Sequence, residues 1–143
     1  MEITRLVVFL VAMSIGFVAA AVSPLREFNA KAAGHLPLIF DIRSARLASG
    51  EIQFVVKITE GRGKLRKPII AQIRTVHVNN GSDLAKPVRE LPVEWDDGSL
   101  TCVFTITDKE LEDPELSFYF GMPALTMPNI EHYYAPLKNF MKP

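Results

Sequence analysis

The chain has 143 residues, of which 48% are hydrophobic and 22% charged, a composition typical of a globular domain and not of a disordered chain. Its 16 Lys and Arg residues equal its 16 Asp and Glu residues, which argues against a nucleic-acid binder or a polybasic membrane-surface protein. The single cysteine, Cys102, excludes an internal disulfide and a zinc site of clustered cysteines.

Residues 1–21 predict a signal peptide. Arg5 precedes an apolar run over residues 6–22, and small alanines occupy positions 19–21, where a signal peptidase reads the chain. We therefore expect cleavage after Ala20 or Ala21, and a secreted or periplasmic domain that is free of the membrane. The alternative is an uncleaved membrane anchor, because an apolar run of this length lies at the short limit for spanning a bilayer.

The remaining chain predicts a linker followed by strands. Residues 22–35 are polar and alanine-rich without clear periodicity, and we expect a linker or one short helix there. From residue 36 onward, apolar and polar residues alternate with the period of half-buried strands. The cleanest pattern is at residues 52–59. In all, the pattern predicts seven strands, at residues 36–47, 52–59, 68–78, 88–95, 100–107, 116–120 and 130–140.

Turn signals lie between several of these strands, at Ser49-Gly50, at residues 79–82 and at residues 96–99. Seven short strands without helical periodicity indicate that residues 36–143 form an antiparallel β-sandwich, immunoglobulin-like or fibronectin-like. The resemblance is one of architecture, because the cysteine pair and central tryptophan of antibody domains are absent. Architecture alone does not determine function.

Cys102 shares its predicted strand face with Leu100, Phe104 and Ile106. Hydrocarbon surroundings raise the pKa of a thiol and suppress its nucleophilicity, so we interpret Cys102 as a core residue and not as a catalyst. No pair of titratable groups has a spacing that implies acid–base or nucleophilic chemistry. We therefore predict that the protein is not an enzyme.

Charge is distributed unevenly along the chain. The basic loop, which we define as residues 61–67, contains the candidate partner-binding residues Arg62, Lys64, Arg66 and Lys67. The acidic loop, defined as residues 108–115, is rich in Asp and Glu. If the strands run alternately up and down, the two loops lie at opposite ends of the sandwich, where their charges steer docking to a charged partner. The alternative is an ordinary solvated surface.

Residues 121–132 suggest a second chemistry. Met122, Met127 and His132 offer thioether and imidazole ligands, which suit Cu(I). The sequence Met-Pro-Ala-Leu-Thr-Met at residues 122–127 is similar to methionine motifs of periplasmic copper-binding proteins. The alternative is a loop whose methionines fill gaps at the end of the sandwich.

Two functions thus remain open. The first is an exported, non-catalytic binding or assembly domain without a cofactor, whose partner is a protein or a surface polymer. The second is a periplasmic Cu(I)-binding protein that uses Met122, Met127 and His132.

Overall fold

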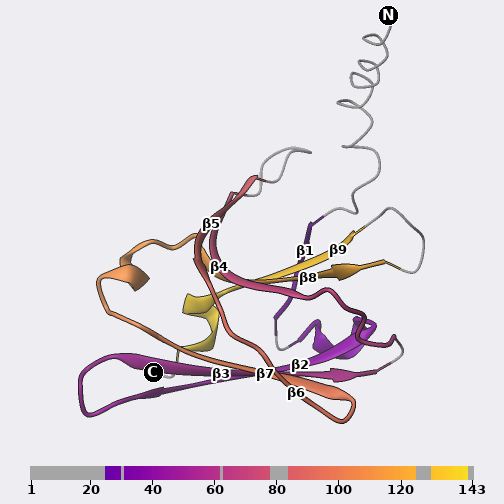
Figure 1. The fold of residues 1–143 in the computed structure, drawn as a ribbon. Coiled ribbons are helices and arrows are strands. Elements are labelled where there is room, and N and C mark those ends of the chain that lie inside the picture. The colour runs from indigo at the N-terminus through magenta and orange to yellow at the C-terminus, as the bar shows by residue number, and fades with distance from the viewer. Residues whose placement is uncertain (1–24, 30, 62, 78–83, 125–129, 142–143) are drawn as a thin grey trace, which may run out of the picture.

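A computed structural model describes residues 25–29, 31–61, 63–77, 84–124 and 130–141. Within these residues, strands form two sheets that face each other as two layers (Figure 1). One sheet has five strands in the order β1-β9-β8-β4-β5, and the other has four in the order β2-β3-β7-β6. The predicted all-β architecture of two sheets is therefore confirmed, whereas the predicted signal peptide lies outside the described residues.

The elements have the following bounds. The five-stranded sheet contains β1 (Leu25–Glu27), β4 (Ile70–His77), β5 (Leu84–Glu90), β8 (Leu116–Pro123) and β9 (Ile130–Pro136). The four-stranded sheet contains β2 (Leu38–Arg46), β3 (Ile52–Glu60), β6 (Glu94–Asp96) and β7 (Ser99–Ile106). The described residues also form the short 3-10 helices η2 (Ala33–His35), η3 (Glu110–Glu112) and η4 (Leu137–Phe140). Among the described residues, no helix is long and apolar enough to cross a membrane.

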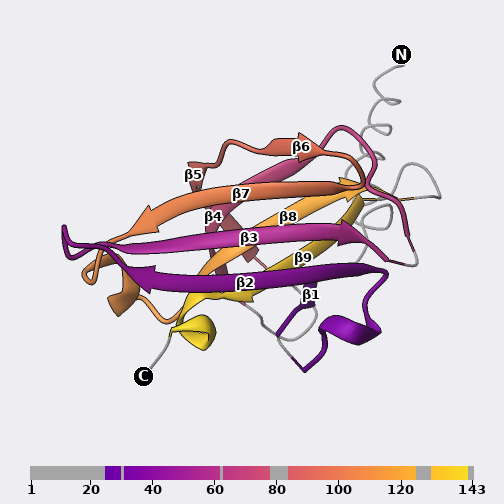
Figure 2. The ribbon, with the colours of Figure 1, turned by 90° about the horizontal axis from the view of Figure 1, so that it is seen from below.

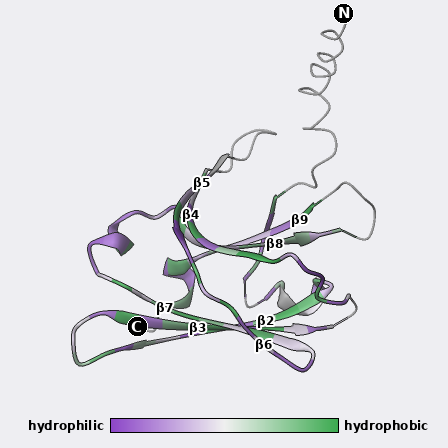
Figure 3. Cartoon of the chain, in the orientation of Figure 1, coloured by the Kyte–Doolittle hydropathy of each residue, from purple (hydrophilic) through white to green (hydrophobic). Residues whose placement is uncertain are grey.

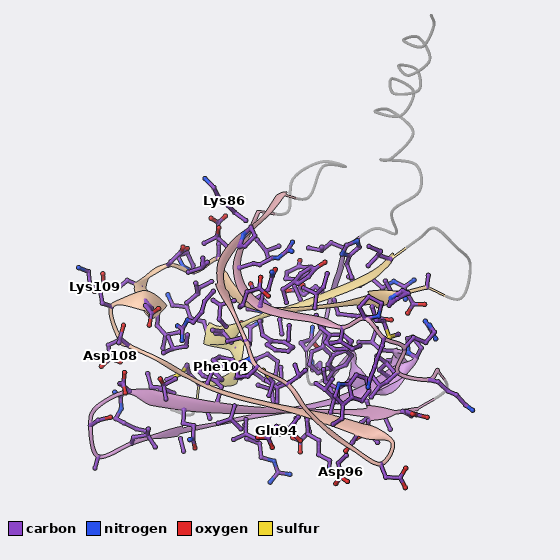
Figure 4. The ribbon with its side chains drawn as sticks, in the orientation of Figure 1. Lys86, Glu94, Asp96, Phe104, Asp108 and Lys109 are labelled. Atoms are coloured by element: carbon purple, nitrogen blue, oxygen red, sulfur yellow. The ribbon has the colours of Figure 1, made fainter. Side chains whose placement is uncertain are left out.

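The core fills the space between the two sheets. Hydrophobic residues recur along the strands of both layers (Figure 3). Alternate side chains of each strand point inward, toward the other sheet. Phe54, Phe104 and Phe118 carry the packing across the sandwich, with ring centroids 5.4 Å and 6.0 Å apart along this series. Figure 4 shows Phe104 between the layers. The alternation read from the sequence therefore identifies the inner faces.

One predicted strand is in fact two. Residues 88–95 contain the end of β5 and the start of β6, which belong to different sheets. Pro92 has no backbone N–H to donate to a ladder, and it lies where the chain crosses from one sheet to the other. Each of the other six predicted strands matches one observed strand, although β9 ends at Pro136 and η4 follows it.

Residues 22–35 are more than the predicted linker or short helix. The structure places β1 there, parallel to β9, and the 3-10 helix η2. Phe28 directly after β1 is 2% exposed, and its ring centroid lies 4.5 Å from that of Phe40. A strand of three residues is too short to show a period-2 pattern, so the alternation could not reveal it.

The basic and acidic loops do lie at opposite ends of the molecule. In the antiparallel ladder of β3 and β7, Ile52 pairs with Ile106 and Thr59 pairs with Ser99. The basic loop follows the end of β3 and the acidic loop follows the end of β7, so the opposed strands separate them. Figure 2 shows these strands side by side in the four-stranded sheet.

Candidate functional site

Polar and aromatic side chains gather on the outer face of the five-stranded sheet. Ile73 on β4 and Phe118 and Phe120 on β8 point into the core. Their neighbours in the chain therefore point outward. We define the outer cluster by five residues from four adjacent strands: Gln72 and Arg74 on β4, Glu90 on β5, Tyr119 on β8 and His132 on β9.

Contacts run through the outer cluster from β5 to β8. Gln72 lies directly between Glu90 and Tyr119 in the ladder, and its side-chain amide donates a hydrogen bond to the Glu90 carboxylate. Arg74 Nε donates to Gln72 Oε1 over 2.6 Å. The Arg74 guanidinium carbon lies 3.7 Å from the centroid of the Tyr119 ring. This cation–π contact and the surrounding sheet leave Tyr119 only 1% exposed, although it is on an outer face.

A glycine makes room for the contact between Tyr119 and His132. The Tyr119 hydroxyl is hydrogen-bonded to Nδ1 of His132 on the neighbouring strand. Gly121 is the cross-strand partner of His132, and a Cβ atom at Gly121 would lie 3.0 Å from the Tyr119 hydroxyl. Any larger residue at position 121 therefore crowds the tyrosine that reaches His132.

The surroundings keep both titratable groups of this pair uncharged. Burial raises the pKa of Tyr119, an effect that the Arg74 charge partly offsets. Burial lowers the pKa of His132 from 6.5, and the charge of Arg74 lowers it further. The Tyr119 hydroxyl donates to Nδ1 when the proton of neutral His132 is on Nε2, and it accepts from Nδ1 when the proton is there. In either tautomer this hydrogen bond engages Nδ1 and leaves Nε2 to another partner.

One hydrogen-bonding atom of His132 has no partner among the described residues. That atom is Nε2, and it is buried. Buried polar groups are nearly always paired, so such an atom calls for an explanation. The outer cluster therefore contains a buried ring nitrogen whose hydrogen-bonding capacity is not used by the described residues.

The structure places two of the three candidate copper ligands, Met122 and His132. Met122 is 1% exposed and belongs to the core. It pairs with Glu131, whereas His132 pairs with Gly121, so Met122 and His132 project to opposite faces of the sheet. Met127 lies outside the described residues. Within the part of the chain that the structure describes, no three His, Cys, Asp or Glu residues group closely enough to hold a metal.

Of the basic loop, Arg66 stabilises the fold. It forms an ion pair with Glu131 at 3.1 Å and donates to the Pro123 carbonyl at 2.7 Å. Glu131 also accepts a hydrogen bond from the Tyr133 hydroxyl, so its carboxylate is held from two sides. The loop is thereby tied to β8 and β9 through Arg66, and the use of Arg66 by a partner stays a prediction.

The other basic residues have different surroundings. The Lys67 ammonium lies 4.7 Å from the centroid of the half-exposed Trp95 ring. Lys64 is exposed, and Arg62 lies outside the described residues. Among the described residues of the basic loop, Lys64 and Lys67 are the exposed candidate partner-binding residues.

The acidic loop is also partly neutralised within the chain. Asp108 pairs with Arg46 at 3.1 Å, and Glu110 pairs with Arg89 at 3.0 Å. Arg89 donates in addition to the Thr105 carbonyl at 3.0 Å, so it links β5 to β7 across the open side of the sandwich. Figure 4 shows Asp108 and Lys109 at the end of the molecule far from Asp96. These ion pairs weaken the electrostatic field by which the acidic loop steers a charged partner.

Cys102 is a core residue, as the alternation predicts. It is 1% exposed, and its thiol lies 3.3 Å from the Pro92 carbonyl. Burial raises the pKa of the thiol from 9.0 to about 12. The thiolate needed for nucleophilic chemistry is therefore nearly absent at neutral pH.

Arg74 and Tyr119 were not predicted as site residues from the sequence. Tyr119 looks like an ordinary strand residue, because tyrosine has high β propensity. The available signal was Tyr119 and Gly121 at alternate positions between the core residues Phe118, Phe120 and Met122.

Comparison with known proteins gives no matching family model, no matching curated protein and no matching solved structure.

Proposed function

We propose that this protein is an exported, non-catalytic binding domain whose partner, a protein or a surface polymer, docks on the outer face of the five-stranded sheet. The observation that carries the proposal is the unpartnered, buried Nε2 of His132 within the outer cluster. A buried polar atom that gains a hydrogen-bond partner on binding contributes to affinity and to specificity. In the outer cluster, Tyr119 binds the other ring nitrogen of His132, while Arg74 stacks on the Tyr119 ring and Gly121 leaves that ring room.

We infer further that the sandwich is immunoglobulin-like. The order β2-β3-β7-β6 corresponds to strands A, B, E and D of that fold, and β9-β8-β4-β5 corresponds to G, F, C and one added strand C′. This strand order supports the inference although the usual disulfide is missing. Cys102 lies on β7 and Trp95 on β6, which are not the strands that carry the conserved cysteines and tryptophan of antibody domains.

The sheet edges favour a face over an edge as the docking surface. β1 and β6 have three residues each, too few to template a long added strand. On β5, Pro87 cannot donate to a ladder. In the pairing of β5 with β4, two successive β4 residues pair with Arg89 and with Pro87. Val88 is therefore the extra residue of a β-bulge, and it is 53% exposed. Ser44 of β2 donates to the Phe140 carbonyl of η4, which covers part of that edge.

Site-specific photo-crosslinking in the producing cells tests the proposed face. A photoreactive residue at Val88 reports on the five-stranded sheet, and one at Val103 on β7 is the matched control on the other sheet. Both positions are exposed valines, at 53% and 45%. We expect adducts of one defined mass from position 88 and none from position 103. Adducts from position 103 alone, or from neither position, would contradict the proposal.

Export is tested on the same material. If the leader is cleaved, intact-mass analysis finds a mature chain that begins near Ala21 or Val22. Full-length chain in the membrane fraction would show that residues 1–21 act as an anchor and would overturn the proposed release from the membrane.

A further inference from the structure

The packing of His132 in the outer cluster suits an uncharged ring only. The Tyr119 hydroxyl engages Nδ1, whereas Nε2 is buried and has no partner among the described residues. A protonated imidazole carries an N–H on both ring nitrogens. Its Nδ1–H can donate to the Tyr119 oxygen, but its Nε2–H is then a buried, charged donor without an acceptor in the described part of the chain. This holds for either tautomer of the neutral ring.

The groups around His132 do not compensate a proton on it. Titratable or charged side chains of the outer face come from every strand of this sheet: Tyr119 on β8, Arg74 on β4, Glu90 on β5, Glu27 on β1 and Tyr134 on β9. Glu90 is bound to Gln72, and Glu27 is exposed. Among the described residues, no carboxylate forms an ion pair with His132. Burial and the Arg74 charge both lower the pKa of His132 from 6.5.

The outer cluster can open while the core stays packed. Phe118 and Phe120, on either side of Tyr119, belong to the core between the sheets. Tyr119 is covered on the other side of β8 by side chains, with the Arg74 guanidinium carbon 3.7 Å from its ring centroid. His132 as a whole residue is only partly buried. Rotation of its side chain therefore brings a charged ring to water without breaking the ladder between β8 and β9.

We propose that His132 and Tyr119 form a pH switch on the docking face: when His132 binds a proton, its ring turns to solvent, Tyr119 loses its hydrogen bond, and the outer cluster loosens. The inference rests on the proposed function in that it concerns the regulation of the same surface. The closed form binds the proton less tightly than the open form, so the face is closed at neutral pH and opens below pH 6.5. Binding of a partner to the closed face weakens in acid as a result.

Solution NMR between pH 7.5 and pH 4.5 tests the switch on the exported protein without a partner. Ring chemical shifts of His132 report its protonation, and an uncharged, soluble gadolinium chelate broadens the signals of side chains that become exposed. We expect the ring signals of Tyr119 to broaden with the same midpoint as the titration of His132. Those of the buried Phe104 should stay sharp, which excludes global unfolding.

Two matched variants assign the transition to one histidine. In His132→Gln, which does not titrate, Tyr119 should stay protected over the whole range. In His35→Gln, which removes an exposed histidine, the transition should be unchanged. Exposure of Tyr119 in His132→Gln would overturn the switch. If this variant does not fold, the unmodified chain decides the matter. Protonation of His132 while Tyr119 stays protected, no protonation down to pH 4.5, or simultaneous exposure of Phe104 would each overturn it.

Crosslinking from position 88 at pH 7.5 and at pH 5 links the switch to docking. We expect the adduct to be lost at pH 5 in the unmodified chain and retained in His132→Gln. An adduct that persists in both proteins at pH 5 would overturn the regulatory role. The two proposals fail separately. An adduct at pH 7.5 without an NMR transition leaves the docking face in place and refutes the switch. A transition without any adduct refutes the docking face alone.

Discussion

The outer faces of the two sheets differ in how far their side chains are exposed. On the four-stranded sheet, Ile39 and Val103 are 51% and 45% exposed, and Asp41 forms only a local pair with Arg43. Figure 4 shows Glu94 and Asp96 at the side of this sheet that faces away from the other layer. On the five-stranded sheet, Tyr119 and Gln72 are 1% and 7% exposed. One outer face is a solvated surface, and the other has a closely packed centre at Tyr119 and Gln72.

This difference shows that burial on a sheet does not require a second layer of strands. Tyr119 is covered by Arg74, whose apolar stem and planar guanidinium shield an aromatic ring while its charge stays near other polar groups. The result is a layer built from hydrogen bonds and a cation–π contact. Because an unpaired polar atom inside such a layer is costly, Nε2 of His132 sets the five-stranded face apart from the other.

The largest expected effect concerns Tyr119 itself. Tyr119→Ala removes a fully buried aromatic side chain, and we expect a loss of about 3 kcal/mol in the free energy of unfolding. The matched change on the other outer face, Val103→Ala, should cost no more than about 0.5 kcal/mol because that side chain is half exposed. Urea denaturation of the two variants gives the comparison. Equal losses would mean that the two outer faces do not differ in packing.

A smaller effect is expected at Gly121. Gly121→Ala places a Cβ atom 3.0 Å from the Tyr119 hydroxyl, and overpacking of this kind should cost about 1–2 kcal/mol. Gly34→Ala is the matched control, because a Cβ atom at Gly34 has no neighbour within 4 Å. Thermal unfolding measures both. A Gly121→Ala variant as stable as the control would show that Tyr119 moves aside freely and that the glycine is not needed.

The third expectation concerns pH. Because the pKa of His132 is lowered by folding, the unfolded chain binds its proton more tightly than the native chain does. The stability that neutral His132 contributes is therefore fully present above about pH 6.5 and is lost as the pH falls through the lower, native pKa. Unfolding free energies between pH 7.5 and pH 5 should fall less steeply for His132→Gln than for the unmodified chain.

The exposed His35 supplies the control for this experiment. We expect His35→Gln to retain the full pH dependence of the unmodified chain. The same slope in all three proteins would remove His132 as the cause of the acid sensitivity.

The sequence was informative about the inner faces and much less so about the outer cluster. Alternating residues such as Phe54 and Phe104 predict burial because one face of each strand must meet the other sheet. Cys102 was assigned to the core by the same argument. By contrast, the contact of Arg74 with Tyr119 joins residues 45 positions apart, and nothing local in the sequence specifies which strands become neighbours. The short strand β1 was missed for the different reason that three residues show no period.

For copper binding, we expect no effect at all. A soft-metal site of Met122, Met127 and His132 requires its sulfur and nitrogen ligands to lie within about 2 to 2.5 Å of one ion. Met122 is packed in the core, on the opposite face of the sheet from His132, so these two ligands do not meet around one ion without disrupting β8 or β9. In a Cu(I) titration against a competing chelator, we therefore expect no tight one-to-one complex. Met127→Leu should leave the titration unchanged. Tight binding that is lost in this variant would show that β8 and β9 rearrange around the metal, and the copper function would then replace the docking face as the better explanation of His132.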